Sequence, residues 1–216
     1  MENQKMEKEL LWERLSDMGK ALGSAERLKI IQLLAQCERS VEELSQVVEA
    51  PINRVSHHLQ RLKTVDLVRG KRQGRHIFYS LTNPDVLEFW IDYLAFVEKH
   101  LPELRLSAKN EETIDYEEAR RLVEAQKAVM IDIRPRAEYE ADHLPGAISL
   151  PLKELNSRLP ELRQYDAVIL CCRGSFCKLA DVALGLLQSE GIRAFRLKSG
   201  VIERQMRYRH SVGEKV

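Results

Sequence analysis

Residues 167–187, AVILCCRGSFCKLADVALGLL, join an apolar run to a short loop and an amphipathic pattern. The run AVILC at 167–171 predicts a strand that is buried on both faces, and residues 177–189 are expected to form a helix. A loop that leads from the C-terminal end of a parallel strand into a helix is where ligands bind in open α/β sheets. This stretch therefore predicts an α/β fold with a functional site in the loop.

Three of the four cysteines of the chain lie in this stretch, at positions 171, 172 and 177. Backbone N–H groups at the helix N-terminus, together with the charges of Arg173 and Lys178, would stabilise a thiolate at Cys172 and lower its pKa. Cys172 is therefore the predicted nucleophile. Cys171 points to the opposite side of the strand because side chains alternate, and we expect it to be a small buried residue.

Outward from the loop, the C-terminal half alternates strands and helices, which is typical of a parallel sheet covered on both faces. Further strands are expected at 128–133, 147–150 and 193–197, and further helices near 117–125 and 200–208. The polar stretch SAKNEE at 107–112 is expected to be a linker. The expected domains are therefore residues 1–106 and residues 113–216.

The N-terminal half is expected to be mainly α-helical with one hairpin, in the order of a winged helix-turn-helix. Helices are expected at 5–22, from Ser24 onward, at 41–48, at 51–63 and at 84–101, with the hairpin at 67–81. Ser40 and Glu43 have the spacing of a capping box, in which each side chain accepts a backbone N–H at the start of a helix.

The helix 51–63 separates an apolar stripe from a polar face when it is projected at about 100° per residue. The inward stripe contains Ile52, Val55, Leu59 and Leu62. His58 lies at the border and is expected to pack within the domain. The outward face and its border carry the groups that bond to base edges and phosphates, namely Asn53, Arg54, Ser56, His57, Gln60 and Arg61.

Positive charge is concentrated around this helix and the hairpin. The whole chain has a formal net charge of +1, whereas the segment from Arg54 to His76 holds seven Lys and Arg residues and one acidic residue, Asp66. A cluster of one sign in a nearly neutral chain is the electrostatic footprint of nucleic-acid binding. Double-stranded DNA is therefore the expected partner of this half.

The segments LGSAERLKIIQLLAQCERSVEEL and VSHHLQRLKTVDLVRGKRQGRHIFYSL resemble the winged-helix domain of the ArsR family of bacterial repressors. The resemblance implies a homodimer formed through the first and last helices, and DNA contacts from Ser56, His57 and the hairpin residues Arg72 and Arg75. Many members bind metals through Cys-x-Cys before the recognition helix. Ser40 and Glu42 stand there in this chain, so we expect no metal site.

Residues 113–216 resemble a single rhodanese domain through Asp132-x-Arg134-Pro135-x-x-Glu138-Tyr139, the segment 143–147 and the segment 168–177. The resemblance implies that Cys172 takes sulfane sulfur from thiosulfate, a persulfide or a polysulfide and passes it to a thiol acceptor. The residues expected to act with it are Arg173 and Cys177, with Gly174, Ser175, Phe176 and Lys178 holding the donor.

This chain departs from the rhodanese pattern at two positions. Cys177 stands where many rhodaneses have Arg, and Arg204 stands in place of the usual Trp. We expect Cys177 to capture a persulfide on Cys172. We also expect the ends of a loop shaped around an anion to lie too far apart for a direct disulfide, so that inserted sulfur atoms bridge them.

Composition bounds the remaining possibilities. The chain has 216 residues, 44% of them hydrophobic and 31% charged, without an apolar run long enough to span a bilayer. The N-terminal residues lack the apolar core of a signal peptide, so we expect a cytoplasmic location, with no membrane partner and no cofactor.

Together these features predict a dimeric repressor whose affinity for its operator responds to sulfane sulfur or to thiol oxidation. Two alternatives stay open. The chain could be a working sulfurtransferase that the winged helix localises, or a repressor that senses arsenic or a soft metal through Cys172, Cys177 and Cys37.

Overall fold

The computed structural model describes residues 2–101, 112–174 and 176–204. The chain divides into two compact units, Met1–Trp90 and Ile91–Val216. The linker expected at 107–112 lies outside the described residues, except for its last residue. None of the helices in the described ranges is long and apolar enough to cross a membrane.

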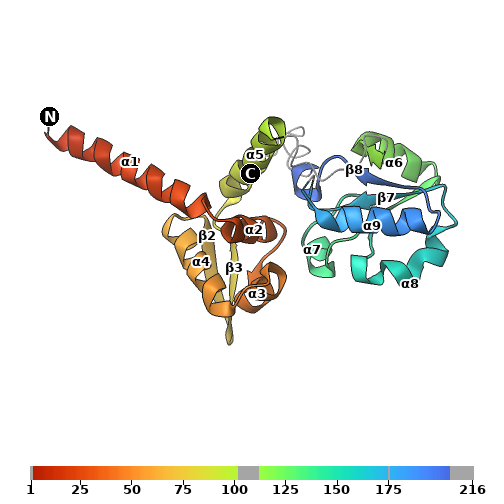
Figure 1. Ribbon diagram of the computed structural model, residues 1–216, viewed down its shortest axis with the longest axis horizontal. Coiled ribbons are helices and arrows are strands. Elements are labelled where there is room, and N and C mark those ends of the chain that lie inside the picture. Colours follow the sequence, from red (N-terminus) through yellow and green to blue (C-terminus); the bar gives the residue numbers. More distant parts are fainter. Residues whose placement is uncertain (1, 102–111, 175, 205–216) are drawn as a thin grey trace. The chain divides into compact units, whose positions relative to one another are not determined.

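The N-terminal unit has the order of a winged helix-turn-helix (Figure 1). Its elements are α1 (Glu2–Leu22), α2 (Ala25–Leu34), β1 (Arg39–Ser40), α3 (Val41–Val48), α4 (Ile52–Thr64), β2 (Val68–Gln73), β3 (His76–Leu81) and the first part of α5 (Pro84–His100), up to Trp90. The three strands form an antiparallel sheet in the order β1-β3-β2, and β2 and β3 are the wing. The helices and the hairpin are where the sequence pattern predicts them.

Local chemistry fixes the helix starts. Ser24 accepts the backbone N–H of Arg27 at the N-terminus of α2, and Ser40 and Glu43 form the expected capping box at α3. Val55, Leu59 and Leu62 of α4 are fully buried, as the projection predicts. The prediction for Ile52 was wrong, because this side chain is 52% exposed. Ile52 is the first residue of α4, and the buried stripe begins one turn later.

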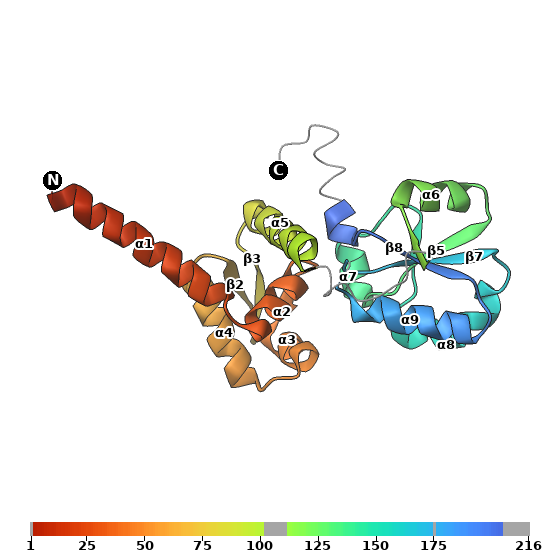
Figure 2. The ribbon, with the colours of Figure 1, turned by 45° about the horizontal axis from the view of Figure 1, so that its top comes forward.

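The C-terminal unit is an α/β fold with a five-stranded parallel sheet in the order β4-β8-β7-β5-β6 (Figure 2). Its elements are β4 (Thr113–Ile114), α6 (Tyr116–Glu124), β5 (Ala128–Asp132), α7 (Arg136–Ala141), β6 (Ala147–Ser149), α8 (Leu152–Leu162), β7 (Ala167–Cys171), α9 (Lys178–Ser189) and β8 (Ala194–Leu197). The predicted fold class is therefore confirmed for both halves.

The sheet separates two apolar cores because alternate residues of each strand face opposite sides. Val168 and Leu170 of β7 pack with side chains of α8 and α9, whereas Ile169 and Cys171 pack on the other face with Ala119 of α6. β7 lies between β8 and β5 in the middle of the sheet. The loop that follows β7 therefore leaves the centre of the sheet.

Several short elements were not predicted from the sequence, namely β1, β4, α7 and α8. The strands have only two residues each, and α8 contains Pro160, which is unfavourable inside a helix. Of the helix expected at 200–208, residues 201–204 are helical and the remainder lies outside the described residues.

Candidate functional site

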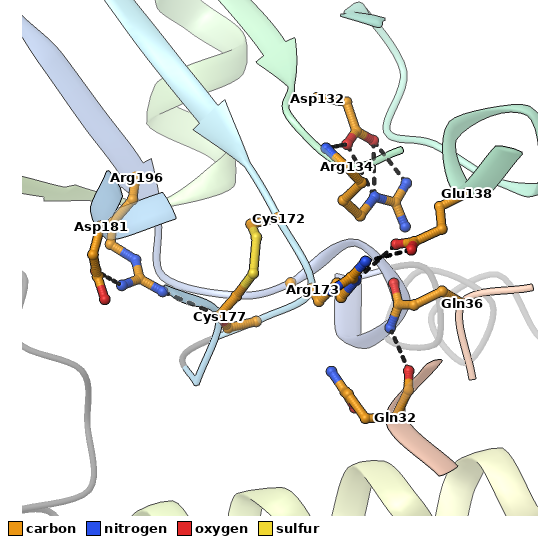
Figure 3. Close-up of a disulfide and its surroundings, with 12 residues drawn as sticks. Gln32, Gln36, Asp132, Arg134, Glu138, Cys172, Arg173, Cys177, Asp181 and Arg196 are labelled. Atoms are coloured by element: carbon orange, nitrogen blue, oxygen red, sulfur yellow. Dashed lines mark hydrogen bonds and ion pairs between the residues drawn. A yellow bond between two sulfur atoms is a disulfide. The ribbon is translucent and has the colours of Figure 1, made fainter. Parts of the chain in front are cut away.

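Cys172 and Cys177 form a disulfide at the C-terminal end of β7 (Figure 3). Their Cα atoms are 6.5 Å apart, inside the range of about 4.4–6.8 Å that direct disulfides need. The expectation that the loop ends lie too far apart for a direct bond was therefore wrong. The backbone at Gly174 has φ +121°, a conformation that favours glycine.

The two neighbouring cysteines face opposite sides of the sheet, as alternation predicts. Cys172 and Cys177 are 5% and 7% exposed and pack in the core formed with α8 and α9, whereas Cys171 packs fully buried in the other core. Burial raises the pKa of the Cys171 thiol well above its usual value, nearby Asp132 raises it further, and Arg134 opposes the shift. Cys171 is therefore a structural residue, as expected.

The charged residue that follows Cys172, Arg173, points to α7 and not to the sulfur atoms (Figure 3). Its Nε and Nη2 donate to the carboxylate of Glu138 at 2.9 and 2.5 Å, and Glu138 is fully buried. The charge that was expected to stabilise a thiolate is thus balanced by a carboxylate. This ion pair joins the loop to α7 instead.

The residues of the motif that resembles rhodanese form further hydrogen bonds beside the pair of Arg173 and Glu138. Asp132, at the end of β5, accepts hydrogen bonds from Nε and Nη2 of Arg134, and both side chains are buried. Arg134 also donates to the carbonyl of Asp142 at 2.7 Å. Tyr139 donates from its hydroxyl to the carbonyl of Ala147 at 2.9 Å. These bonds fix the chain around α7 where Glu138 meets the loop.

Arg196 on β8 also holds the loop, and sequence reasoning missed it. Its guanidinium donates to the carbonyl of Gly174 at 3.0 Å and to Asp181 of α9 at 2.7 Å (Figure 3). The signal in the sequence was a charged residue inside the apolar run RAFRL. Among the other predicted loop residues, Phe176 is half-buried, Lys178 is exposed at the start of α9, and Ser175 lies outside the described residues.

Arg204, which replaces the usual Trp, lies with its guanidinium 4.5 Å from the centre of the Tyr116 ring and pairs with Glu117. It therefore packs against α6.

The polar face of α4 is at the surface. Asn53, Arg54, His57 and Gln60 are exposed, and Ser56 and Arg61 are half-buried. On the wing, Arg72 and Arg75 are exposed. The eight residues predicted to contact DNA therefore lie on α4 and the wing, where solvent reaches them, and their contacts with DNA remain a prediction.

Some side chains on and beside this face form hydrogen bonds or ion pairs within the N-terminal unit. His58 lies between Glu26 and Arg27 of α2, with its Nε2 2.6 Å from the Glu26 carboxylate, which confirms the expectation that it packs. This hydrogen bond lowers the pKa of Glu26 against an opposing effect of burial, and Arg54 at 3.4 Å lowers it further. Arg61 pairs with Asp17 at 3.4 Å.

Both halves match known protein families. Residues 24–69 match the bacterial regulatory protein, arsR family, and residues 115–203 match the rhodanese-like domain. The chain is 33% identical over 208 residues to the HTH-type transcriptional regulator Rv0324 of Mycobacterium tuberculosis, covering 94% of this chain and 92% of that protein. The similarity to this regulator spans both units.

Other relatives match one half. The adenylyltransferase and sulfurtransferase MOCS3 of Drosophila ananassae is 34% identical over 125 residues, which are 52% of this chain and 27% of that protein. Among solved structures, a homodimeric winged helix-turn-helix DNA-binding domain from Mycobacterium bovis, a possible ArsR-family regulator, is 33% identical with a TM-score of 0.42, covering 44% of this chain and 87% of that chain.

Proposed function

The chain belongs to the arsR family of bacterial regulatory proteins and carries a rhodanese-like domain, and from this membership we propose a cytoplasmic repressor that binds double-stranded operator DNA and responds to sulfane sulfur through Cys172 and Cys177. The observation that carries the proposal is the Cα separation of 6.5 Å between these cysteines. That separation lets two thiols form a direct bond in the loop where the resembled family transfers sulfur.

The polar face of α4 supports the DNA-binding part of the proposal. His57 and Arg54 are exposed on this helix, and Arg72 and Arg75 are exposed on the wing beside it. An exposed Arg–carboxylate pair is weak in water, so Arg54 can exchange Glu26 for a phosphate or a base edge. We infer that α4 enters the major groove and that the wing contacts the adjacent backbone.

Exposed apolar side chains on α1 and α5 support a homodimer. These are Leu10, Leu11, Trp12 and Leu15 of α1 and Phe89 and Phe96 of α5. Four of these side chains lie within residues 10–15 of one helix, and large exposed apolar side chains gathered in this way mark interaction surfaces in soluble proteins. The ArsR family pairs through its first and last helices, so a second copy of this chain is the proposed partner.

The sulfur chemistry balances with the two cysteines of the loop and a persulfide donor, which is the oxidant. The Cys172 thiolate attacks the outer sulfur of a persulfide donor, forming an S–S bond and releasing the donor as a thiol. The Cys177 thiolate then attacks Sγ of Cys172, which breaks the new bond, expels hydrosulfide and leaves the disulfide that the structure contains. The net result is oxidation of the cysteine pair and reduction of the sulfane sulfur.

An operator-binding experiment tests the proposal. The affinity of the reduced full-length protein for its operator is measured at fixed salt, with and without polysulfide, because phosphate contacts make affinity depend on salt. A coupling free energy of about 1–3 kcal/mol predicts that polysulfide weakens binding roughly 5- to 150-fold. Cys172→Ser and Cys177→Ser should bind DNA like the reduced wild type with or without polysulfide.

Cys37→Ser serves as the matched control, since Cys37 lies in the other unit and should leave the response intact. Mass spectrometry of the treated protein should find Cys172 and Cys177 linked. The proposal fails if the wild-type affinity is unchanged by polysulfide while the two cysteines become linked, because the sulfur chemistry is then not coupled to DNA.

The match to the MOCS3 sulfurtransferase favours a second candidate, a rhodanese-type enzyme that passes sulfur from thiosulfate or a persulfide to a thiol acceptor. This enzyme would be supported if each protein molecule transferred many sulfur atoms while its affinity for DNA was the same with and without the donor. The operator-binding experiment is also carried out with arsenite in place of polysulfide. Release of DNA by arsenite from the wild type, and not from the Cys172→Ser and Cys177→Ser proteins, would support a soft-metal sensor instead.

A further inference from the structure

Arg196 is a buried cation that takes no part in the proposed reaction of the two cysteines with the donor. It lies on β8, opposite Leu170 of β7, and is 4% exposed. Burying a guanidinium costs free energy unless charged and polar groups surround it. Two of the groups that Arg196 contacts lie in the cysteine loop and in the helix after it, so the position of Arg196 is tied to the state of that loop.

The guanidinium joins three elements (Figure 3). Nη2 donates to the carbonyl oxygen of Gly174 at 3.0 Å, and Nη1 donates to Oδ1 of Asp181 at 2.7 Å. Gly174 lies between the two cysteines, and Asp181 is in the first turn of α9. Arg196 therefore connects β8 to the middle of the loop and to the helix that begins after Cys177.

The carbonyl of Gly174 also binds the second cysteine directly. The backbone N–H of Cys177 donates to the same oxygen at 3.1 Å. This carbonyl thus accepts one bond from Arg196 and one from the residue whose sulfur closes the disulfide. Fixing its direction fixes the backbone of Cys177, and so holds Sγ of Cys177 against Sγ of Cys172.

We propose that Arg196 is a positioning residue that stabilises the closed, disulfide-bonded loop relative to the open dithiol loop. The inference rests on the proposed function, because it assigns a control of the same cysteine pair. Closing a loop costs conformational entropy, and bonds that form with the closed loop offset that cost. A lysine keeps the charge but lacks the planar fork that reaches two acceptors at once.

The test measures the equilibrium between dithiol and disulfide in glutathione buffers. In this reaction the two thiols of Cys172 and Cys177 are oxidised to a disulfide and one oxidised glutathione is reduced to two thiols. Arg196→Lys should make disulfide formation about tenfold less favourable, which corresponds to a midpoint potential about 30 mV less negative. Arg163→Lys is the control, because Arg163 forms an exposed ion pair with Glu190 in the same unit.

A second variant keeps the proposal testable if Arg196→Lys does not fold. Asp181→Asn leaves Arg196 in place but removes the charge that orients it, and should shift the equilibrium in the same direction by a smaller factor. Thermal unfolding of each variant is measured in both redox forms. A positioning role lowers the stability of the disulfide form more than that of the dithiol form.

Equal losses of stability in both forms, with an unchanged midpoint potential, would overturn the proposal and leave the sulfur response intact. If polysulfide fails to link the cysteines while oxidised glutathione links them, the proposed function fails. The shift in Arg196→Lys then still decides the role of Arg196.

Discussion

The polar face of α4 and the loop between β7 and α9 both use arginine–carboxylate pairs, but in different surroundings. Arg61 and Asp17 beside α4 are each about two-fifths exposed and 3.4 Å apart. Arg173 of the loop is 15% exposed, and its partner Glu138 is fully buried at 2.5 Å. Water weakens the first pair and leaves its arginine available to other partners, whereas burial makes the second pair a fixed part of the fold.

The largest expected effect comes from removing a carboxylate from the buried pair. Glu138→Ala should lower the free energy of unfolding of the C-terminal unit by about 3 kcal/mol or more, because it leaves Arg173 largely buried without this carboxylate. Both tryptophans, Trp12 and Trp90, lie in the N-terminal unit. Urea unfolding followed by circular dichroism, with tryptophan fluorescence reporting the N-terminal unit, measures the effect. A loss below 1 kcal/mol would contradict the distinction between the two regions.

The next effect concerns the exposed face. His57→Ala should weaken operator binding by about 1–3 kcal/mol, because a contact to a base edge is lost. The free energy of unfolding should hardly change, since His57 is exposed. Fluorescence anisotropy with labelled operator measures the affinity, and Lys153→Ala, an exposed change in the other unit, is the control. A variant that binds the operator as tightly as the control removes His57 from the interface.

The wing should contribute charge without base recognition. Arg72→Ala is expected to weaken binding to operator and to unrelated DNA alike, and to reduce the slope of log affinity against log salt by about 0.9 for each lost phosphate contact. A salt titration of both DNAs measures this slope. An unchanged slope would place Arg72 away from the phosphates.

The smallest effect sharpens the comparison of the two ion pairs. Arg61→Ala should change the free energy of unfolding by only about 0.2–1 kcal/mol, because its pair with Asp17 is exposed. The same urea experiment as for Glu138→Ala, read by tryptophan fluorescence, gives the value. A cost similar to that of Glu138→Ala would mean that exposure does not separate the two regions.

Much of the fold could be predicted because its signals are local. Capping at Ser40 and apolar periodicity at Val55, Leu59 and Leu62 specify helices through neighbours a few residues apart. Ile52 was misassigned because periodicity does not say where a buried stripe begins. The two-residue strands β1 and β4 carry too few residues for a pattern, and their partners are distant in sequence.

The candidate site was predicted unevenly for the same reason. Cys172, Cys177 and the polar residues of α4 could be identified from residue type and position. The sequence pattern did not indicate that Arg173 turns to Glu138, 35 residues away, or that Arg196 reaches Gly174, 22 residues away. These partners meet only because parallel strands bring their C-terminal ends to one edge of the sheet.

The sequence by itself determined the two fold classes, the surface character of α4 and which cysteines lie in the loop after β7, since each depends on residue type and short-range spacing. Only the tertiary structure decided that the two cysteines lie within direct bonding range and which carboxylate or carbonyl each arginine of the C-terminal unit binds. The physical reason is that loop closure and ion pairing depend on distances set by the packing of the whole sheet, which no short segment specifies.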